Sequence, residues 1–142
     1  MIRVVIAEDH AVVRAGLTQL LGSARDLEVV AAASDGEQAV ALAAEHEPDI
    51  VLMDLSMPRM NGCDATARIV ARRPEIRVVV LTSFSDREQI LAALDAGAVG
   101  YLLKDSEPDE LIRSVRAAAG GAWPLAPRAV HALMDARRQG GA

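Results

Sequence analysis

The chain has 142 residues, of which 51% are hydrophobic and 25% are charged, and its formal net charge is −5. These values are typical of one soluble globular domain, and the negative charge argues against direct binding of DNA or RNA by these residues. The single cysteine excludes an internal disulfide, and no apolar run approaches the roughly 20 residues that cross a bilayer. We therefore expect a cytoplasmic protein without a signal peptide and without a membrane partner.

Short apolar runs alternate with helical patterns along most of the chain. The runs expected to form strands are Ile2–Ala7, Leu27–Ala31, Ile50–Met53, Val78–Leu81 and Val99–Leu103. Most of them lack the polar alternation of a strand with one solvated face, so we expect helices on both sides of them.

Five helices of about three turns are expected between and after these strands. They span about Ala11–Gly22, about Gly36–Glu45, a segment from Asn61 to the residue before Pro74, a segment that begins at Ser85–Glu88, and a segment from about Ser106 to Gly120. Apolar side chains expected to face the core are Val12, Val13, Leu17, Leu20 and Leu21 in the first helix and Ile90, Leu91 and Leu94 in the fourth.

Capping residues support these helix starts. Ser34 or Asp35 precedes the second helix and Asn61 precedes the third, while Ser85–Glu88 fits a capping box. Pro108 lies in the first turn of the fifth helix, where its missing amide hydrogen does little harm.

Alternating strands and helices predict an α/β fold with right-handed crossovers and a parallel sheet. Five such units in a chain of this length predict a doubly wound five-stranded parallel sheet with the flavodoxin-like order 2-1-3-4-5. A closed eight-stranded barrel would need far more residues.

The carboxyl ends of the predicted strands are followed by polar residues. Glu8 and Asp9 follow the first strand, Asp54 follows the third, Thr82 follows the fourth and Lys104 follows the fifth. In a doubly wound sheet the ligand site lies at this edge, where the winding reverses. Because the first and third strands are neighbours in the predicted order, we expect the three carboxylates to lie together.

Three adjacent carboxylates repel one another unless a cation lies between them. Mg²⁺ prefers oxygen ligands and is typically held by one or two carboxylates together with a phosphate. Asp54 beside Mg²⁺, a hydroxyl and a lysine has the parts for phosphoryl transfer, with Asp54 as the nucleophile. Lys104 would neutralise charge on the phosphoryl oxygens, and the hydroxyl of Thr82 would donate a hydrogen bond to one of them.

Four segments together resemble the receiver domain of two-component response regulators. They are Glu8-Asp9 after the first strand, Met53–Gly62, Leu81–Ser83 and Gly97–Asp105. The first helix, with His10 and Val13–Leu17, resembles the NarL/FixJ branch (the LuxR-type regulators) in particular. The resemblance covers roughly residues 1 to 121, with the segments in the family's order and spacing.

This resemblance implies that Asp54 accepts a phosphoryl group from a sensor histidine kinase. It implies Mg²⁺ bound by Asp9, Asp54 and the main-chain oxygen of Ser56, with Glu8 acting through water. Thr82 and Tyr101 match the family's switch pair, in which the hydroxyl moves to the phosphoryl group and the ring turns inward. The switch would repack the face formed by the fourth helix, fifth strand and fifth helix, where a partner or second protomer docks.

Two positions depart from the family's usual pattern. Glu8 stands where many receivers have aspartate, and Asp105 follows Lys104 where many have a proline that forms a cis peptide. The geometry of the Lys104–Asp105 bond is therefore left open. Ser56 and Phe84 occupy positions at which the family tunes the hydrolysis of its phosphate.

Several other residues have plain structural interpretations. We expect His10 to begin the first helix rather than to bind a metal, and we expect Cys63 to be an inert thiol. The arginines of the third helix, which are Arg68, Arg72 and Arg73, are expected to form a solvated face.

Two enzyme or carrier classes share the predicted fold. A haloacid-dehalogenase-type phosphatase needs a second aspartate two residues after the nucleophile, and this chain has Ser56 there. A flavodoxin-like carrier needs a phosphate-binding loop after the first strand and aromatic residues around the flavin, and the aromatic content here is 2%. Both classes are disfavoured, and the chain is expected to assist its own phosphorylation rather than to act as an enzyme on another substrate.

Residues 1–121 are thus expected to form the receiver domain. Residues 122–142 contain two prolines and a possible short helix over Arg128–Arg138, and are interpreted as a linker to a DNA-binding domain outside this chain. The full protein would then be a transcription regulator that dimerises on phosphorylation and binds DNA only through that missing helix-turn-helix domain. The alternative is a stand-alone receiver that acts through protein contacts.

Overall fold

The structure is a computed structural model, and it describes residues 1–83 and 87–123. The strands are β1 (Ile2–Ala7), β2 (Leu27–Ala33), β3 (Ile50–Asp54), β4 (Arg77–Thr82) and β5 (Gly100–Leu103). The helices are α1 (Ala11–Gly22), α2 (Gly36–His46), α3 (Gly62–Arg72), α4 (Arg87–Asp95) and α5 (Pro108–Ala119). Each predicted strand and helix is present, and the boundaries differ by only a few residues.

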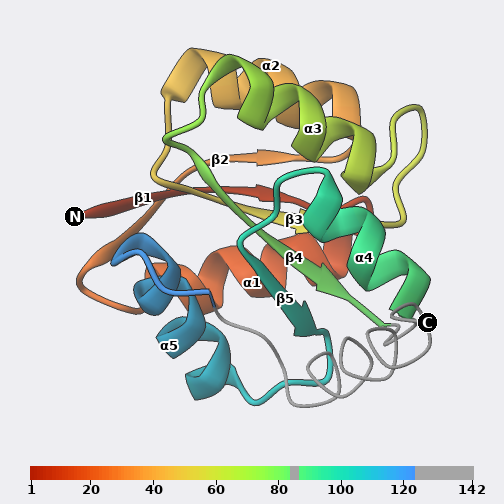
Figure 1. Ribbon diagram of the computed structural model, residues 1–142. Coiled ribbons are helices and arrows are strands. Elements are labelled where there is room, and N and C mark those ends of the chain that lie inside the picture. Colours follow the sequence, from red (N-terminus) through yellow and green to blue (C-terminus); the bar gives the residue numbers. More distant parts are fainter. Residues whose placement is uncertain (84–86, 124–142) are drawn as a thin grey trace.

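The five strands form one parallel sheet in the order β2-β1-β3-β4-β5. Helices α2, α3 and α4 lie on one side of the sheet, and α1 and α5 lie on the other (Figure 1). The predicted doubly wound, flavodoxin-like fold is therefore confirmed.

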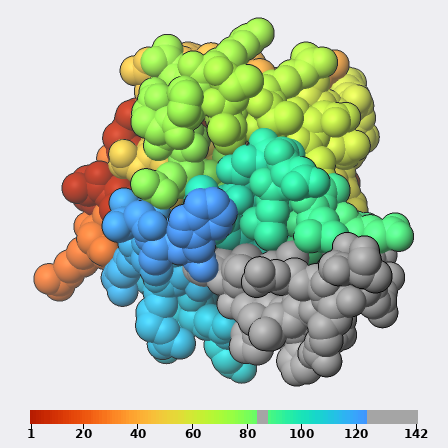
Figure 2. Space-filling model, in the orientation of Figure 1, coloured from red at the N-terminus to blue at the C-terminus, as the bar shows by residue number. Residues whose placement is uncertain are grey.

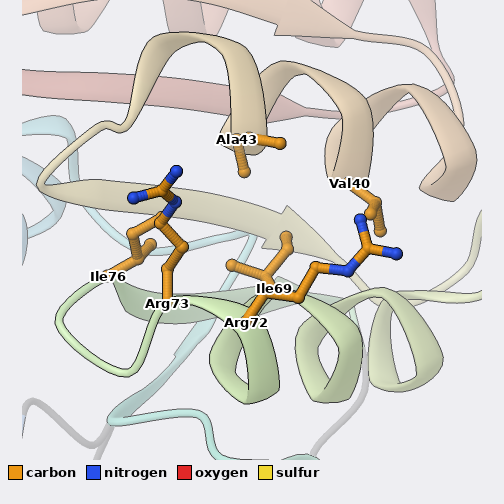
Figure 3. A pocket seen from close by; sticks show the side chains of 7 residues that line it. Val40, Ala43, Ile69, Arg72, Arg73 and Ile76 are labelled. Atoms are coloured by element: carbon orange, nitrogen blue, oxygen red, sulfur yellow. The ribbon is translucent and has the colours of Figure 1, made fainter.

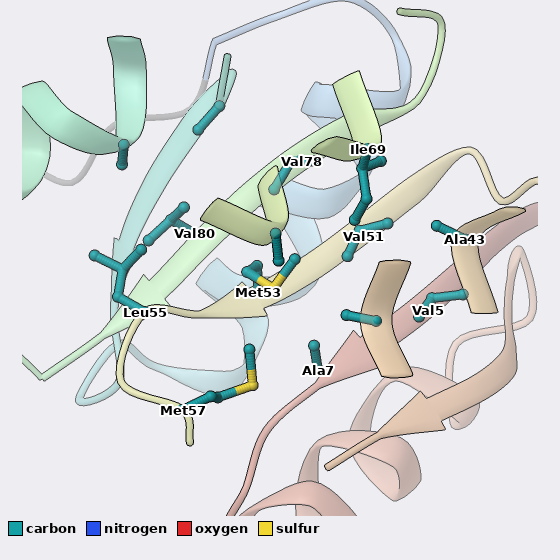
Figure 4. Close-up of a cluster of buried hydrophobic side chains, with 14 of the residues drawn as sticks. Val5, Ala7, Ala43, Val51, Met53, Leu55, Met57, Ile69, Val78 and Val80 are labelled. Atoms are coloured by element: carbon teal, nitrogen blue, oxygen red, sulfur yellow. The ribbon is translucent and has the colours of Figure 1, made fainter. Parts of the chain in front are cut away.

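The core on the side of α2, α3 and α4 consists mainly of alanine, valine and isoleucine side chains, with a few methionine, leucine and tyrosine side chains (Figure 4). Alternate residues of the central strands point into it, among them Val51 and Met53 of β3 and Val78 and Val80 of β4. This face contains Tyr101, which is 0% exposed. Helices α3 and α4 also contact each other, and the space-filling view shows them side by side (Figure 2).

The core on the side of α1 and α5 contains the other set of strand residues. Leu52 of β3 and Val79 of β4 pack there with Leu21 of α1 and Val115 of α5, and all four are almost fully buried. Because successive strand residues point to opposite faces, sheet residues buried on both sides appear in the sequence as continuous apolar runs. This explains why the strands were predictable from the sequence.

Two of the expected side-chain caps are present, and Pro108 lies in the first turn of α5 as expected. The side chains of Asp35 and Asn61 accept hydrogen bonds from the amides of Gln38 and Asp64, at 2.8 and 2.9 Å. Helix α5 begins at Pro108, two residues after Ser106, because proline fixes the backbone at the first helical position. Ser85 of the predicted capping box and the predicted helix of Arg128–Arg138 lie outside the described residues.

The predicted apolar face of α1 is wrong in its first turn. Val12 is 86% exposed and Val13 is 38% exposed, whereas Leu21 is fully buried and Leu17 and Leu20 are half-buried. The first turn of α1 faces solvent, so Val12 and Val13 do not belong to the hydrophobic core although they are apolar. Leu91 of α4 is also exposed, at 39%, because it points away from the face that buries Ile90.

A cavity of about 260 Å³ lies between α2 and α3 (Figure 3). Val40 and Ala43 of α2 and Ile69 of α3 form its apolar lining, and Arg72 and Arg73 reach across it toward α2. Arg73 forms an ion pair with Glu47. Arg68 and Arg72 are exposed and Arg73 is half-buried, as expected for the arginines of α3.

Within the described part of the chain, no helix has both the length and the apolar content needed to cross a membrane.

Candidate functional site

The polar residues at the strand ends meet at one edge of the sheet. Asp54 is the last residue of β3 and Thr82 is the last residue of β4, so the backbone of each is fixed by the sheet. Glu8 follows β1 directly, and its amide donates to the carbonyl of Ala33 at 3.0 Å. The amide of Lys104 donates to the carbonyl of Thr82 at 2.8 Å, which fixes the end of β5 beside β4.

Lys104 joins two of the acidic side chains. Its Nζ lies 2.6 Å from Oε1 of Glu8 and 3.3 Å from Oδ2 of Asp54. Glu8 is 1% exposed and Asp54 is 4% exposed, so both carboxylates are shielded from water. The predicted grouping of Glu8, Asp54 and Lys104 is therefore present in the structure.

The two buried carboxylates differ in proton affinity. Burial raises the pKa of Glu8, but hydrogen bonding to Asp54 and to Lys104 outweighs burial and brings its pKa down to about 2. Burial, followed by hydrogen bonding to Glu8 and the charge of Glu8, raises the pKa of Asp54 to about 7. The ammonium is nearer to Glu8, so a proton shared by the pair resides on Asp54 when no other cation is present. Burial lowers the pKa of Lys104, but the adjacent acids outweigh it and the net shift is upward.

The carboxylate oxygens of this site fit a divalent cation. With the acids ionised, Oδ1 of Asp9 and Oδ2 of Asp54 are buried and receive no hydrogen bond from the described residues. One ligand atom each from Glu8, Asp9, His10 and Asp54 lies within 4.8 Å of the others. One lysine cannot balance three carboxylates, and Mg²⁺ takes oxygen ligands of this kind. The donor set therefore fits the Mg²⁺ that was expected.

The loop after β3 wraps closely around Asp54. The amide of Ser56 donates to Oδ1 of Asp54 at 3.3 Å, and the amide of Gly62 donates to the carbonyl of Leu55 at 3.0 Å. A Cβ atom on Gly62 would lie 2.3 Å from the carbonyl oxygen of Asp54, so only glycine permits this approach of α3. One oxygen of Asp54 thus accepts a hydrogen bond from the loop, and the other lies beside Lys104.

A cavity of about 280 Å³ lies over Asp54. Its lining residues are His10, Asp54, Ser56, Thr82, Ser83 and Lys104. A carboxylate at the floor, with a hydroxyl residue and an ammonium at the wall, can accept a group that becomes more negative during transfer. This arrangement suits nucleophilic attack by Asp54 on phosphorus.

Tyr101 lies in β5, two strand positions before Leu103, and pairs with Val80. Its ring is 0% exposed and packs in the core on the side of α2, α3 and α4. The ring therefore lies inward in this structure.

Two contacts at the site were not predicted. The Nη1 atom of Arg14 donates to the carbonyl of Glu8 at 2.8 Å and so ties α1 to the end of β1. His10 is the N-cap residue of α1, as expected, but its side chain makes no capping bond and lies 3.2 Å from Asp9. Both residues belong to the segment that resembles the NarL/FixJ branch, which was the only sequence signal for them.

Two remaining expectations concern geometry and reactivity. The described residues contain no cis peptide, so the Lys104–Asp105 bond is trans. Cys63 is half-buried, and burial together with the charge of Asp64 raises the pKa of its thiol. A raised thiol pKa fits the inert cysteine that was expected.

A family model for the response regulator receiver domain matches residues 4–116. The transcriptional regulatory protein YhcZ of Bacillus subtilis is 43% identical over 138 residues, which cover 96% of this chain and 64% of YhcZ. A LuxR-family two-component response regulator from Aurantimonas superposes with a TM-score of 0.90 at 33% identity, covering 96% of this chain and 97% of that one. The receiver domain of the putative response regulator NarL from Mycobacterium tuberculosis superposes with a TM-score of 0.82 at 34% identity, covering 84% of this chain and 97% of that one.

The fold and the acidic strand-end site thus define a receiver domain. The chain belongs to the response-regulator receiver family, and its resemblance to the NarL/LuxR-type members is confirmed. It spans less than two thirds of the length of YhcZ.

Proposed function

We propose that the chain is the phosphorylation-dependent switch of a transcription regulator, and that Asp54 accepts a phosphoryl group from a sensor histidine kinase. The observation that supports this most is the buried carboxylate of Asp54, whose Oδ2 lies 3.3 Å from the Lys104 ammonium and which lines a cavity together with Thr82 and Lys104. Family membership supports the same reaction.

In the proposed reaction Oδ2 of Asp54 attacks phosphorus as the bond from phosphorus to the kinase's histidine nitrogen breaks. The phosphoryl group moves to Asp54, and the released imidazole takes up a proton from solvent. The Lys104 ammonium, 3.3 Å from Oδ2, and the Thr82 hydroxyl would stabilise the phosphoryl oxygens. The chain would therefore assist its own phosphorylation and the later hydrolysis, without being an enzyme for another substrate.

Mg²⁺ would neutralise charge on the phosphoryl oxygens when it is bound. Asp9, Asp54 and the main-chain oxygen of Ser56 would hold it, with Glu8 acting through water. The buried Oδ1 of Asp9, which lacks a hydrogen-bond donor in the described part of the chain, and its place in one acidic group with Glu8 and Asp54 support this ligand set.

We propose that Thr82 and Tyr101 transmit the signal to the face formed by α4, β5 and α5. The Thr82 hydroxyl would move toward the phosphoryl group, and the inward ring of Tyr101 would be favoured. Since the ring is already buried here, the proposal requires that the unphosphorylated chain also populates an outward ring, and that phosphorylation shifts this equilibrium.

The output of the switch is proposed from the relatives. YhcZ is a transcriptional regulatory protein that extends well beyond the match, which supports a receiver over residues 1–121, a linker over 122–142 and a DNA-binding domain outside this chain. Phosphorylation would promote a homodimer in the cytoplasm. A stand-alone receiver that acts through protein contacts is the alternative, and reading the gene beyond Ala142 distinguishes the two.

Phosphorylation of the purified chain by acetyl phosphate with Mg²⁺ tests the assignment. Intact-mass measurement should show one added phosphoryl group, and Asp54→Asn should abolish it. Asp64→Asn is the matched control, because Asp64 is an exposed acid in the first turn of α3 and should remain fully labelled. Undiminished labelling of a folded Asp54→Asn variant would refute the proposal.

A further inference from the structure

His10 occupies the first boundary position of α1 but does not act as a side-chain cap. Its backbone is extended and its side chain makes no hydrogen bond to the amides of the first turn. Residues favoured at this position have a short side chain that accepts such a bond, which imidazole does not replace well. The side chain of His10 is instead directed to the acidic end of β1.

The imidazole lies among the carboxylates. Its Nδ1 is 3.2 Å from Oδ1 of Asp9 and 3.6 Å from Oε2 of Glu8. Oδ1 of Asp9 nevertheless has no hydrogen-bond partner among the described residues, so Nδ1 is close to it without the orientation of a donor. When a metal ion is bound through bonds of about 2.1 Å, two neighbouring ligand atoms lie about 3.0 Å apart. The 3.2 Å between Nδ1 of His10 and Oδ1 of Asp9 is close to that separation.

The same cavity contains a second carboxylate of the acidic group. Oδ2 of Asp54 is buried and accepts no hydrogen bond in the described part of the chain, and its nearest positive charge is the Lys104 ammonium at 3.3 Å. His10 and Asp54 both line the cavity over the sheet edge. One atom each from His10, Glu8, Asp9 and Asp54 lies within 4.8 Å of the rest, and opposite ligands of one ion would be about 4.2 Å apart.

We propose that His10 supplies a nitrogen ligand to the acidic site, which therefore binds borderline divalent cations such as Ni²⁺ or Zn²⁺ in competition with Mg²⁺. This proposal rests on the proposed function only in placing Mg²⁺ at the same carboxylates. Hard Mg²⁺ keeps oxygen ligands and water and gains little from imidazole. Ni²⁺ and Zn²⁺ bind imidazole well, so His10 determines the selectivity of the site.

Mg²⁺ and a cation bound partly by His10 would therefore affect the site differently. A cation held partly by His10 would fix the imidazole over the cavity that the phosphoryl group must enter. Such a cation would exclude Mg²⁺ and hinder the approach of a phosphodonor. The site would then respond to the balance of the two kinds of cation.

Calorimetric titration of the full chain with NiCl₂ and, separately, with MgCl₂ tests the proposal. The wild type should bind one Ni²⁺, and added Mg²⁺ should weaken the apparent Ni²⁺ affinity. In His10→Gln the ratio of the Ni²⁺ to the Mg²⁺ association constant should fall about tenfold or more. His46→Gln is the matched control, because His46 lies at the end of α2, outside the acidic group, and should leave this ratio unchanged.

A spectroscopic readout identifies the ligand directly. Cu²⁺ bound to the wild type should show nitrogen hyperfine coupling in its electron paramagnetic resonance spectrum, and His10→Gln should lose that coupling. An unchanged ratio in folded His10→Gln, or Ni²⁺ binding that Mg²⁺ does not oppose, overturns the inference. Failure of acetyl phosphate to label Asp54 would refute the proposed function while leaving these titrations intact.

Discussion

Lys104 is the only lysine in a chain that has 15 lysine and arginine residues in total. Its ammonium lies between Glu8 and Asp54, at 2.6 and 3.3 Å from one oxygen of each. A compact ammonium on a flexible stem can meet two separate carboxylates, whereas a planar guanidinium prefers paired contacts with one. Lysine therefore suits position 104, where one side chain contacts the carboxylates of both Glu8 and Asp54.

Replacing Lys104 should separate ion binding from phosphoryl transfer. Lys104→Met removes a positive charge from beside the acids, so Mg²⁺ should bind as tightly as in the wild type or more tightly. Labelling by acetyl phosphate should slow by about 100-fold, because one group that stabilises the transferring oxygens is lost. Calorimetry gives the first quantity, and the time course of the intact mass gives the second.

Lys104→Arg provides the matched control for charge. If charge alone matters, Lys104→Arg should be labelled by acetyl phosphate at the wild-type rate. We expect this variant to be labelled at least about tenfold more slowly, because the planar guanidinium does not fit between the two carboxylates. A Lys104→Met variant that loses Mg²⁺ affinity and labelling in parallel would contradict the assigned role, since Lys104 would then only hold the carboxylates in place.

At the scale of elements, α2 and α3 are placed by their side-chain caps and by close backbone contacts. Asp35 and Asn61 cap α2 and α3 through their side chains. The first residue of each of these helices is a glycine packed against backbone: Gly36 faces the carbonyl of Met60, and Gly62 faces that of Asp54. The loop that surrounds Asp54 is thus held from both ends by positions where a side chain does not fit.

Gly62→Ala should therefore be strongly destabilising. Its Cβ would lie 2.3 Å from the carbonyl oxygen of Asp54 and 2.7 Å from Cα of Leu55, and neither backbone atom can rotate away. We expect a loss of about 2 kcal/mol or more in the free energy of unfolding, measured by urea denaturation.

Gly16→Ala is the matched control for the same added methyl group. Gly16 lies inside α1 with no atom within 4 Å of its added Cβ, so alanine should stabilise the chain by about 1 kcal/mol. Equal effects of the two substitutions would mean that the approach of α3 to Asp54 is not as close as described.

How much the sequence predicted also depends on the element. The strands were predictable because both of their faces are buried, and the tendency of ligand sites to lie at the carboxyl ends of parallel strands was enough to group Glu8, Asp54 and Lys104. The first turn of α1 was predicted wrongly, because Val12 and Val13 fit an apolar period and yet face solvent. Periodicity reports which residues share a helix face, not whether a sheet covers that face.

The finer geometry of the site was beyond sequence reasoning. That Lys104 lies nearer to Glu8 than to Asp54, and that His10 is directed to Asp9 rather than to its own helix, depends on side-chain torsions and on neighbours far away in the chain. The order of residues in the sequence does not determine the position of either side chain. The same applies to the hydrogen bond from Arg14 to the carbonyl of Glu8.

At the scale of the molecule, one sheet separates two apolar cores and brings Glu8, Asp54 and Lys104 together at one edge. The edge is formed by the ends of β1, β3, β4 and β5, which are far apart in the sequence. A ligand that binds there contacts the ends of several strands and therefore recognises only the folded chain. Binding at this edge should consequently stabilise the fold as a whole.

Mg²⁺ should raise the thermal stability of the whole molecule. At a free concentration ten times its dissociation constant, a ligand that binds only the folded state stabilises it by about 1.4 kcal/mol, which corresponds to about 5 °C in the melting temperature of a domain of this size. The measurement is the increase in melting temperature caused by MgCl₂, compared with NaCl at equal ionic strength.

The variant Asp9→Asn should lose this increase in melting temperature, because it removes an oxygen that is buried and lacks a hydrogen-bond partner among the described residues. Asp64→Asn should keep it, since that acid is exposed on α3. Equal increases in all three proteins would place the ion somewhere other than the strand-end carboxylates.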